Sequence, residues 1–399
     1  AISSVSTDEL KMSSSSSLSN ALAGRISGLT ATQSIGGQPG KDDATLYLRG
    51  IGTTNSSAPL IMIDGVPRSN IRTIDPNEVE SISVLKDASA TAVFGVRGAN
   101  GAILITTKRG KKGKPELSIS AEQSYTSFTY EPERLSSVEY LNIRNEALRN
   151  DGSSALFSQD LIDKYKNPTA GLDPNDTDYE YKAMLRNYMY PNHDYYRELI
   201  KKHSPQTRVN ANLSGGIDKL SYFVNASYIH QGGNLKTEKK SFLGYDPSSK
   251  MDRWSFRGNL DYKITNSLKA YLNIGTYIEK VNMPNPDSYP NSDQNWMMRD
   301  IMYQAVTILP ITPGPVTLPG FGVEENGLIY PTYLDRSPFE IINRSGYLNE
   351  TRSNLNSTFG VDFDLSNYIT KGLSIKGMVS YDNISRTTLK GHKRERLYT

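Results

Sequence analysis

The sequence of 399 residues contains no cysteine, which excludes disulfide bonds, thiolate metal sites and cysteine nucleophiles. It has no apolar run near the roughly 20 residues that a membrane-spanning helix needs, so helical membrane proteins are excluded as well. Neither sign of charge is in strong excess, because the sequence has 45 Lys and Arg and 42 Asp and Glu. The first residues, Ala1 to Val5, show no export signal. Membrane β-barrels are not excluded, since alternating apolar and polar residues keep their mean hydropathy low.

Segments with alternating apolar and polar residues fill the sequence from residue 116 onward. In one segment Trp254 and Leu260 belong to an apolar face, while Arg257 and Asn259 belong to a polar one. We expect lipid on the first face and the barrel lumen on the second, so that Leu260→Arg costs about 2–4 kcal/mol and Asn259→Arg much less. The seven predicted strands, each near the length that crosses a bilayer, are residues 117–130, 209–217, 220–228, 254–264, 268–278, 355–365 and 373–381.

The connections between these strands alternate between short and long. The short ones are residues 218–219, 265–266 and 366–372, and the long ones are residues 131–205, 232–250 and 282–350. Outer-membrane barrels have short periplasmic turns and long extracellular loops, so the pattern favours such a barrel. A large soluble β-sandwich or lectin-like domain with one polar face per strand is the alternative interpretation.

The odd number of predicted strands has a consequence for the length of the protein. Single-chain bacterial barrels have even strand numbers and must close, because an open edge in lipid leaves backbone groups unpaired. We therefore expect the sequence to be part of a longer chain that supplies the remaining strands.

The first 115 residues follow a different pattern. A short helix is expected from Leu18 to Ser27, followed by short strands at residues 29–33, 45–49, 60–63, 81–85 and 102–107. The sequence thus predicts two domains, a compact α+β unit at residues 1–115 and the strands at residues 116–399.

Motifs in the α+β unit resemble the plug domain of TonB-dependent receptors. Leu48-Arg49-Gly50 is followed by PLIMIDGVP at residues 59–67, in the order seen in those plugs. The stretch LKDASATAVFGVRGANG at residues 85–101 is similar to the SusC/RagA-like branch of that family. The resemblance continues beyond the plug, through the helical pattern at residues 136–147 and the hairpin at residues 213–223.

The resemblance implies a fold and a function. The fold is a membrane β-barrel, an antiparallel barrel of about 22 strands, of which this chain forms the N-terminal part, with the α+β plug inside the lumen. The function is import of oligosaccharides or oligopeptides across the outer membrane of a Gram-negative bacterium. The implied partners are a SusD-like surface lipoprotein, TonB with its inner-membrane energising complex, outer-membrane lipid and the ligand.

Other functions are less well supported by the residues. Neither catalysis nor a cofactor is expected, no nucleic-acid partner is expected, and the four histidines lack the spacing of a metal site. A surface adhesin or outer-membrane assembly component is the alternative function, and a glycan-degrading enzyme is a further one. The sequence does not decide between a glycan and a peptide as ligand.

Candidate functional residues come from the plug motifs and the loops. The glycines among them suit sharp turns or close backbone approach, and the charged residues suit ion pairs within the plug or to the barrel wall. The candidates for structure or gating are Arg49, Gly50, Asp64, Gly65, Lys86, Asp87, Arg97, Gly98 and Gly101. The candidates for ligand contact, through hydrogen bonds or aromatic stacking, are Asn55, Ser56, Ser57, Tyr289 and Trp296.

Overall fold

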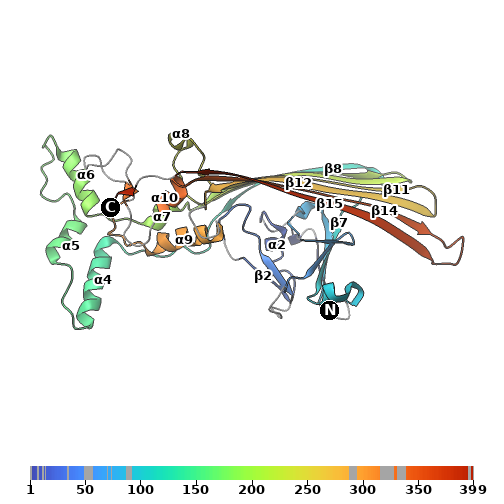
Figure 1. Cartoon of the computed structure of the whole chain (residues 1–399), viewed down its shortest axis with the longest axis horizontal. Coiled ribbons are helices and arrows are strands. Elements are labelled where there is room, and N and C mark those ends of the chain that lie inside the picture. Colours follow the sequence, from blue (N-terminus) through green and yellow to red (C-terminus); the bar gives the residue numbers. More distant parts are fainter. Residues whose placement is uncertain are drawn as a thin grey trace.

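The structure is a computed structural model in which a small α+β domain lies against one face of a long antiparallel sheet (Figure 1). A group of helices extends beyond one end of that sheet. The described residues are 2–6, 9–10, 13, 15–33, 36–48, 57–69, 71–72, 74–86, 92–286, 294–314, 328–329, 338–393 and 397–398.

The long sheet has seven antiparallel strands in the order β15-β14-β12-β11-β10-β9-β8, so neighbours in the chain are neighbours in the sheet. Its alternating sequence pattern fits a pleated sheet that has one polar and one apolar face. The strands are β8 (Gly113–Thr126), β9 (Ser204–Gly216), β10 (Leu220–Gly232), β11 (Lys250–Lys263), β12 (Leu268–Pro284), β14 (Gly346–Asp364) and β15 (Ser374–His392).

The three long connections contain helices, whereas the turns at the other end of the sheet are short. Helix α4 begins with a capping box in which Ser136 and Glu139 satisfy each other's backbone N–H groups. In the first connection lie α4 (Ser137–Asn150), α5 (Gln159–Lys166), α6 (Tyr179–Met189) and α7 (Tyr195–Leu199). The second and third contain α8 (Lys240–Leu243), α9 (Gln294–Thr307), α10 (Pro338–Asn343) and the short strand β13 (Leu328–Ile329), which pairs with β16 (Leu397–Tyr398).

The α+β domain is built on a five-stranded mixed sheet in the order β1-β6-β7-β4-β5. Its strands are β1 (Ile2–Ser6), β4 (Leu60–Ile63), β5 (Val66–Arg68), β6 (Val79–Leu85) and β7 (Ala102–Thr107). A second pair of strands, β2 (Leu29–Thr32) and β3 (Thr45–Leu48), lies beside it with the helix α2 (Leu18–Ala21) and the 3₁₀ segments η1 (Pro76–Glu78) and η2 (Ala92–Gly98).

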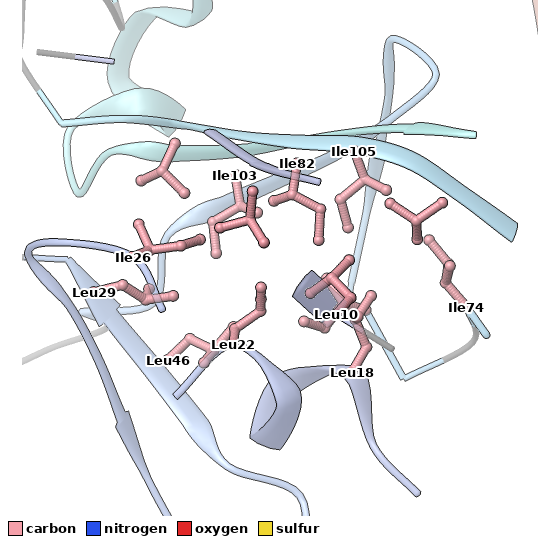
Figure 2. Packing of buried hydrophobic residues seen from close by; sticks show 14 of the residues in the cluster. Leu10, Leu18, Leu22, Ile26, Leu29, Leu46, Ile74, Ile82, Ile103 and Ile105 are labelled. Carbon is pink, nitrogen blue, oxygen red and sulfur yellow. The ribbon is translucent and has the colours of Figure 1, made fainter. Parts of the chain in front are cut away.

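An apolar core holds this domain together (Figure 2). Ile82, Ile103 and Ile105 from the sheet point toward Leu18 and Leu22 from the α2 region, and all five are buried. Every residue of this core cluster comes from the first 105 residues of the chain. The domain therefore stabilises itself by burying its own apolar surface, independently of the long sheet.

The two faces of the long sheet differ as the sequence predicts. Trp254 and Leu260 are exposed by 44 % and 39 %, whereas Arg257 and Asn259, which alternate with them, are buried at 3 % and 0 %. The polar face is turned toward the plug-like domain and the apolar face away from it. Among the described residues no helix has the length and apolar character needed to span a bilayer.

The surroundings of Asn259 change the reasoning about one expected substitution. The sequence predicts that Asn259→Arg costs much less than Leu260→Arg because the position faces a lumen. Asn259 is instead enclosed, and its side-chain amide donates to Thr107 Oγ1 at 2.9 Å and to the Lys108 carbonyl at 2.7 Å. An arginine there would displace the neighbouring domain, so the substitution carries an overpacking cost.

Candidate functional site

Several charged side chains meet at the boundary between the α+β domain and the long sheet. At its centre, the carboxylate of Glu279 on β12 is fully buried. It accepts from Arg253 Nε of β11 at 2.8 Å and from Arg352 of β14 at 2.9 Å. Arg72 of the α+β domain reaches the same carboxylate at 3.3 Å and also pairs with Asp43 at 2.9 Å. Glu279 thus joins the two domains through charge.

A second cluster lies two residue pairs from Glu279 along the β12–β14 ladder. The carboxylate of Glu350 on β14 pairs with Arg352 on its own strand and with Arg386 of β15 at 2.7 Å. Lys41 of the α+β domain reaches it at 3.3 Å. Burial, together with the nearby charge of Arg352, lowers the pKa of Lys41 from 10.5 to about 8. The surroundings of this lysine therefore disfavour its charge, and among the described residues Glu350 is the carboxylate that compensates it.

A third contact is more completely buried. Arg257 of β11 donates to Glu78 of η1 at 2.6 Å, and both side chains are at most 3 % exposed. Burial raises the pKa of the Glu78 carboxyl, while the guanidinium of Arg257 opposes that shift. Removing one member of such a pair leaves an uncompensated buried charge, whereas the intact pair adds little net stability. The contact fixes position more than it adds strength.

Close backbone packing accompanies these ion pairs. A side chain at Gly40 would place its Cβ 2.7 Å from Val281 Cγ2, and the φ of Gly40 is +71°. The Gly40 carbonyl accepts from Arg352 at 3.1 Å and also from Arg72. Gly40 is therefore a position where only glycine lets the domain approach the sheet.

The other part of the boundary, toward β8, β9 and β10, has a different chemistry. A cavity of about 520 Å³ lies there, lined by three serines of the run at residues 13–16, by amide side chains and by Phe128. Among its described lining residues Asp42 is the one with a carboxylate; this group accepts from Gln231 Nε2 at 3.2 Å, and burial raises its pKa. Within the described residues, the buried Asn20 Oδ1 and Gln231 Oε1 accept no hydrogen bond. Its described lining therefore offers serine and amide hydrogen-bonding groups, the Asp42 carboxyl and the Phe128 ring.

The structure describes several of the candidate plug residues. Asp64 and Gly65 form the turn between β4 and β5, with φ values of 49° and 84°. The Asp64 carboxylate accepts from the backbone N–H of Thr107 at 2.9 Å and from its hydroxyl at 2.6 Å, so its role is to join β4 to β7. A Cβ at Gly101 would lie 2.5 Å from Leu48 Cδ1, which explains the glycine there.

The remaining candidates that the structure describes lie in different segments of the α+β domain. Lys86 follows β6, and Arg97 and Gly98 lie in η2, where Arg97 is exposed and Gly98 is buried. Ser57 is half-buried just before β4. Outside the described residues lie Arg49, Gly50, Asn55, Ser56, Asp87 and Tyr289, together with the side chain of Trp296, whose backbone belongs to α9.

Sequence reasoning placed the polar residues of the strands on the lumen face but did not single out the pairs that carry the boundary. A signal was available in the register. Arg253 lies opposite Glu279, Glu279 opposite Arg352, and Arg352 opposite Arg386, so charged residues form a row across four strands. Long charged side chains at inward positions of consecutive strands, once aligned, would have indicated this cluster.

Comparison with known proteins agrees with the fold and the motifs. Residues 1–102 match the family model described as the TonB-dependent Receptor Plug Domain. The chain is 30 % identical over 288 residues to TonB-dependent receptor P26 of Formosa agariphila, covering 70 % of this chain and 25 % of that protein. It is 28 % identical over 286 residues to TonB-dependent receptor SusC of Bacteroides thetaiotaomicron, covering 68 % and 25 %. The chain belongs to the SusC/RagA-like TonB-dependent receptors.

A solved structure gives the fold of this receptor segment. The structure titled "Structure of the RagAB peptide transporter" aligns with a TM-score of 0.69 at 22 % identity, over 97 % of this chain and 41 % of that chain. The α+β domain is therefore the plug, and the long sheet is part of the wall of a large antiparallel barrel that surrounds it. The chain spans about a quarter of the length of the curated relatives it matches.

Proposed function

We propose that this receptor imports oligosaccharides or oligopeptides across the bacterial outer membrane, with energy delivered through TonB and with a SusD-like lipoprotein as an extracellular lid. The observation that carries the proposal is the boundary between plug and wall. It is held by ion pairs and hydrogen bonds that water can replace, whereas the plug core is apolar and self-contained. Such a plug can change its position or shape without losing its own core.

The chemistry of the cavity beside β8 to β10 supports the same proposal. Serine and amide groups form hydrogen bonds with hydroxyls and with peptide groups alike, and Phe128 offers an apolar face to a sugar ring or a side chain. One aligned structure is titled a peptide transporter, and the hydrogen-bonding groups of the cavity suit sugar hydroxyls as well. Both ligand classes therefore belong in the test.

Uptake is the measurement that separates the candidate functions. Cells producing the whole receptor, with or without TonB, are given a labelled oligosaccharide or a labelled oligopeptide. An importer accumulates one class of label inside the outer membrane, and only when TonB is present. Surface binding without accumulation would indicate an adhesin, and conversion of the label by the purified receptor would indicate an enzyme.

A reversible tether tests whether the plug moves. This segment contains no cysteine, so a pair introduced at Thr107 and Asn259, whose side chains are in contact, is the only pair in it. Oxidation of Thr107→Cys/Asn259→Cys is expected to stop TonB-dependent uptake, and a reductant is expected to restore it. The single variants serve as controls. Full uptake by the oxidised double variant would contradict the proposed movement.

A further inference from the structure

A second cavity lies on the opposite face of the long sheet, away from the plug. The connection between β10 and β11 carries α8, and this helix lies over the face of the sheet that is turned away from the plug (Figure 1). Arg344 next to α10 anchors the connection through two hydrogen bonds to Glu238, at 2.7 and 2.8 Å. The Tyr245 hydroxyl adds a bond to the Asn343 carbonyl at 2.6 Å. The connection therefore forms a fixed overhang.

The cavity beneath this overhang measures about 550 Å³. Its floor includes Asp252, Lys280 and Thr351, which lie at equal heights on β11, β12 and β14. Asp252 lies two positions from Trp254, Lys280 two positions from Ile278 and Thr351 four positions from Leu355. These three apolar residues are exposed on the apolar face. Because side chains alternate along a strand, this floor belongs to the outer face. A ligand in the lumen is separated from it by the sheet.

The carboxylates of this cavity are already occupied. Asp246 accepts from Lys250 Nζ at 2.6 Å and from the Ser248 hydroxyl at 2.6 Å. Asp252 accepts from the Tyr228 hydroxyl at 2.7 Å and lies 2.9 Å from His230 Nδ1. The third acid of the lining, Glu350, pairs with Lys41, Arg352 and Arg386. Among the described residues these contacts satisfy the three acids without using Lys240 or Lys280.

Two lysines of the cavity, Lys240 on α8 and Lys280 on β12, form no ion pair with a carboxylate in the part of the chain that the structure describes. The ammonium of Lys280 lies 5.8 Å from the centroid of the Trp254 ring, a cation–π distance that leaves its donors free. The cavity thus presents two available cations, flanked by Tyr245 and Tyr347.

The position of the cavity along the strands indicates which part of the membrane surrounds it. Directly below it begins the apolar band of the outer face, which includes Trp254, Ile278, Leu355 and Phe359, all exposed. In a membrane barrel, aromatic rings mark the level of the lipid headgroups, and lysines just beyond them lie among the headgroups themselves. Basic pockets at this level recognise anionic lipids.

We propose that this outer cavity binds the phosphate-bearing headgroup of a lipid in the outer leaflet, with Lys240 and Lys280 as the phosphate donors. The inference rests on the membrane location in the proposed function, but not on transport. Two ammonium groups complement a phosphate, and the tyrosines and Phe242, which is exposed on α8, complement the adjoining sugar or acyl part. The lipid would hold α8 and the overhang against the wall.

The test uses the whole receptor in phosphatidylcholine nanodiscs that contain a diphosphorylated lipid A, the same lipid without phosphates, or neither. Native mass spectrometry measures the retained lipid. Lys240→Glu/Lys280→Glu is expected to weaken retention of the phosphorylated lipid at least about tenfold. Lys239→Glu is the matched control, because Lys239 is an exposed neighbour that does not line the cavity, and it should retain the lipid as the wild type does.

Two outcomes would overturn the inference: equal retention by wild type and double variant, and equal retention of both lipids by the wild type. Displacement of the lipid by millimolar inorganic phosphate would also count against a lipid site. If charge reversal impairs insertion, Lys240→Gln/Lys280→Gln provides a milder pair with the same expected direction. TonB-dependent uptake is measured separately, so loss of lipid retention with normal uptake supports this inference and leaves the proposed function intact.

Discussion

Glu279 is one of two carboxylates at the plug boundary, with Glu350, that three cationic side chains surround. Three arginines surround its carboxylate, one of them from the plug. Glu279→Gln keeps the shape of the side chain but removes the carboxylate paired with the buried Arg253, while Arg72 keeps Asp43 and Arg352 keeps Glu350. We expect the free energy of unfolding of the whole receptor to fall by about 3–5 kcal/mol. Denaturant unfolding in detergent measures the difference.

The matched control for this change is an exposed ion pair. Asp160→Asn removes the partner of Lys164 on α5, where both side chains are well exposed, and should cost less than about 1 kcal/mol. If Glu279→Gln cost no more than Asp160→Asn, the buried cluster would not hold the plug in place.

Lys41 predicts a dependence on pH. Its pKa is lowered from 10.5 to about 8, so between these values the unfolded chain binds the proton more strongly than the folded protein does. The contribution of this group to stability therefore rises with pH from about 8 to about 10.5. Comparing Lys41→Met with the wild type, we expect the stability difference to shift in favour of the wild type over this range. Unfolding free energies at several pH values test this, and a constant difference would refute it.

At the scale of elements, the sequence pattern finds the strands but misplaces some of their ends. Strand β14 begins at Gly346 and β12 continues to Pro284, whereas alternation predicted a start at residue 355 and an end at residue 278. Near the long connections both faces of the strands become polar, as at Glu350 and Thr351, although the hydrogen-bonded ladder continues. Alternation of polarity therefore indicates the part of each strand that faces the bilayer, and the backbone pairing continues beyond that part.

The candidate site could be predicted only in part for a related reason. Alternation assigns Arg257 to the lumen face, but its partner Glu78 is 179 residues away in another domain. No local pattern encodes such a pairing. The plug motifs were identified by their resemblance to the family, and the structure accounts for some of their glycines, such as Gly65 in a turn and Gly101 in close packing.

The exposed apolar face gives a prediction for single strand positions. Leu260→Arg places a charge in the apolar band and should destabilise the folded receptor in lipid by about 2–4 kcal/mol. Ser120→Arg is a better lumen control than Asn259→Arg, because Ser120 pairs with the inward Asn210 yet is exposed. Folding into lipid vesicles compares the two variants. Equal costs would remove the assignment of the apolar face to lipid.

For the whole molecule, the separation of the cores is the main physical feature. Among the described residues, those of the plug core all come from the first 105 positions, and a distinct small cluster of wall residues includes Met251, Val281 and Met283. We therefore expect a fragment of residues 1–112 to fold as a soluble monomer. Circular dichroism and a dispersed amide NMR spectrum would show this, whereas a fragment that stays unfolded would mean that the wall is needed to form the plug.

The place of β1 at the edge of the plug sheet has a mechanical consequence. In the described sheet β1 is bonded on one side only, through five residue pairs from Ile2↔Leu85 to Ser6↔Ser81. A tensile load applied at Ile2 and directed away from β6 breaks these hydrogen bonds one after another, while β6 and β7, each held on both sides, resist as a unit. Val5 would then leave the core while the Glu279 and Glu350 clusters still anchor the rest. The plug sheet would therefore unfold from β1 inward before the ion pairs between plug and wall are broken.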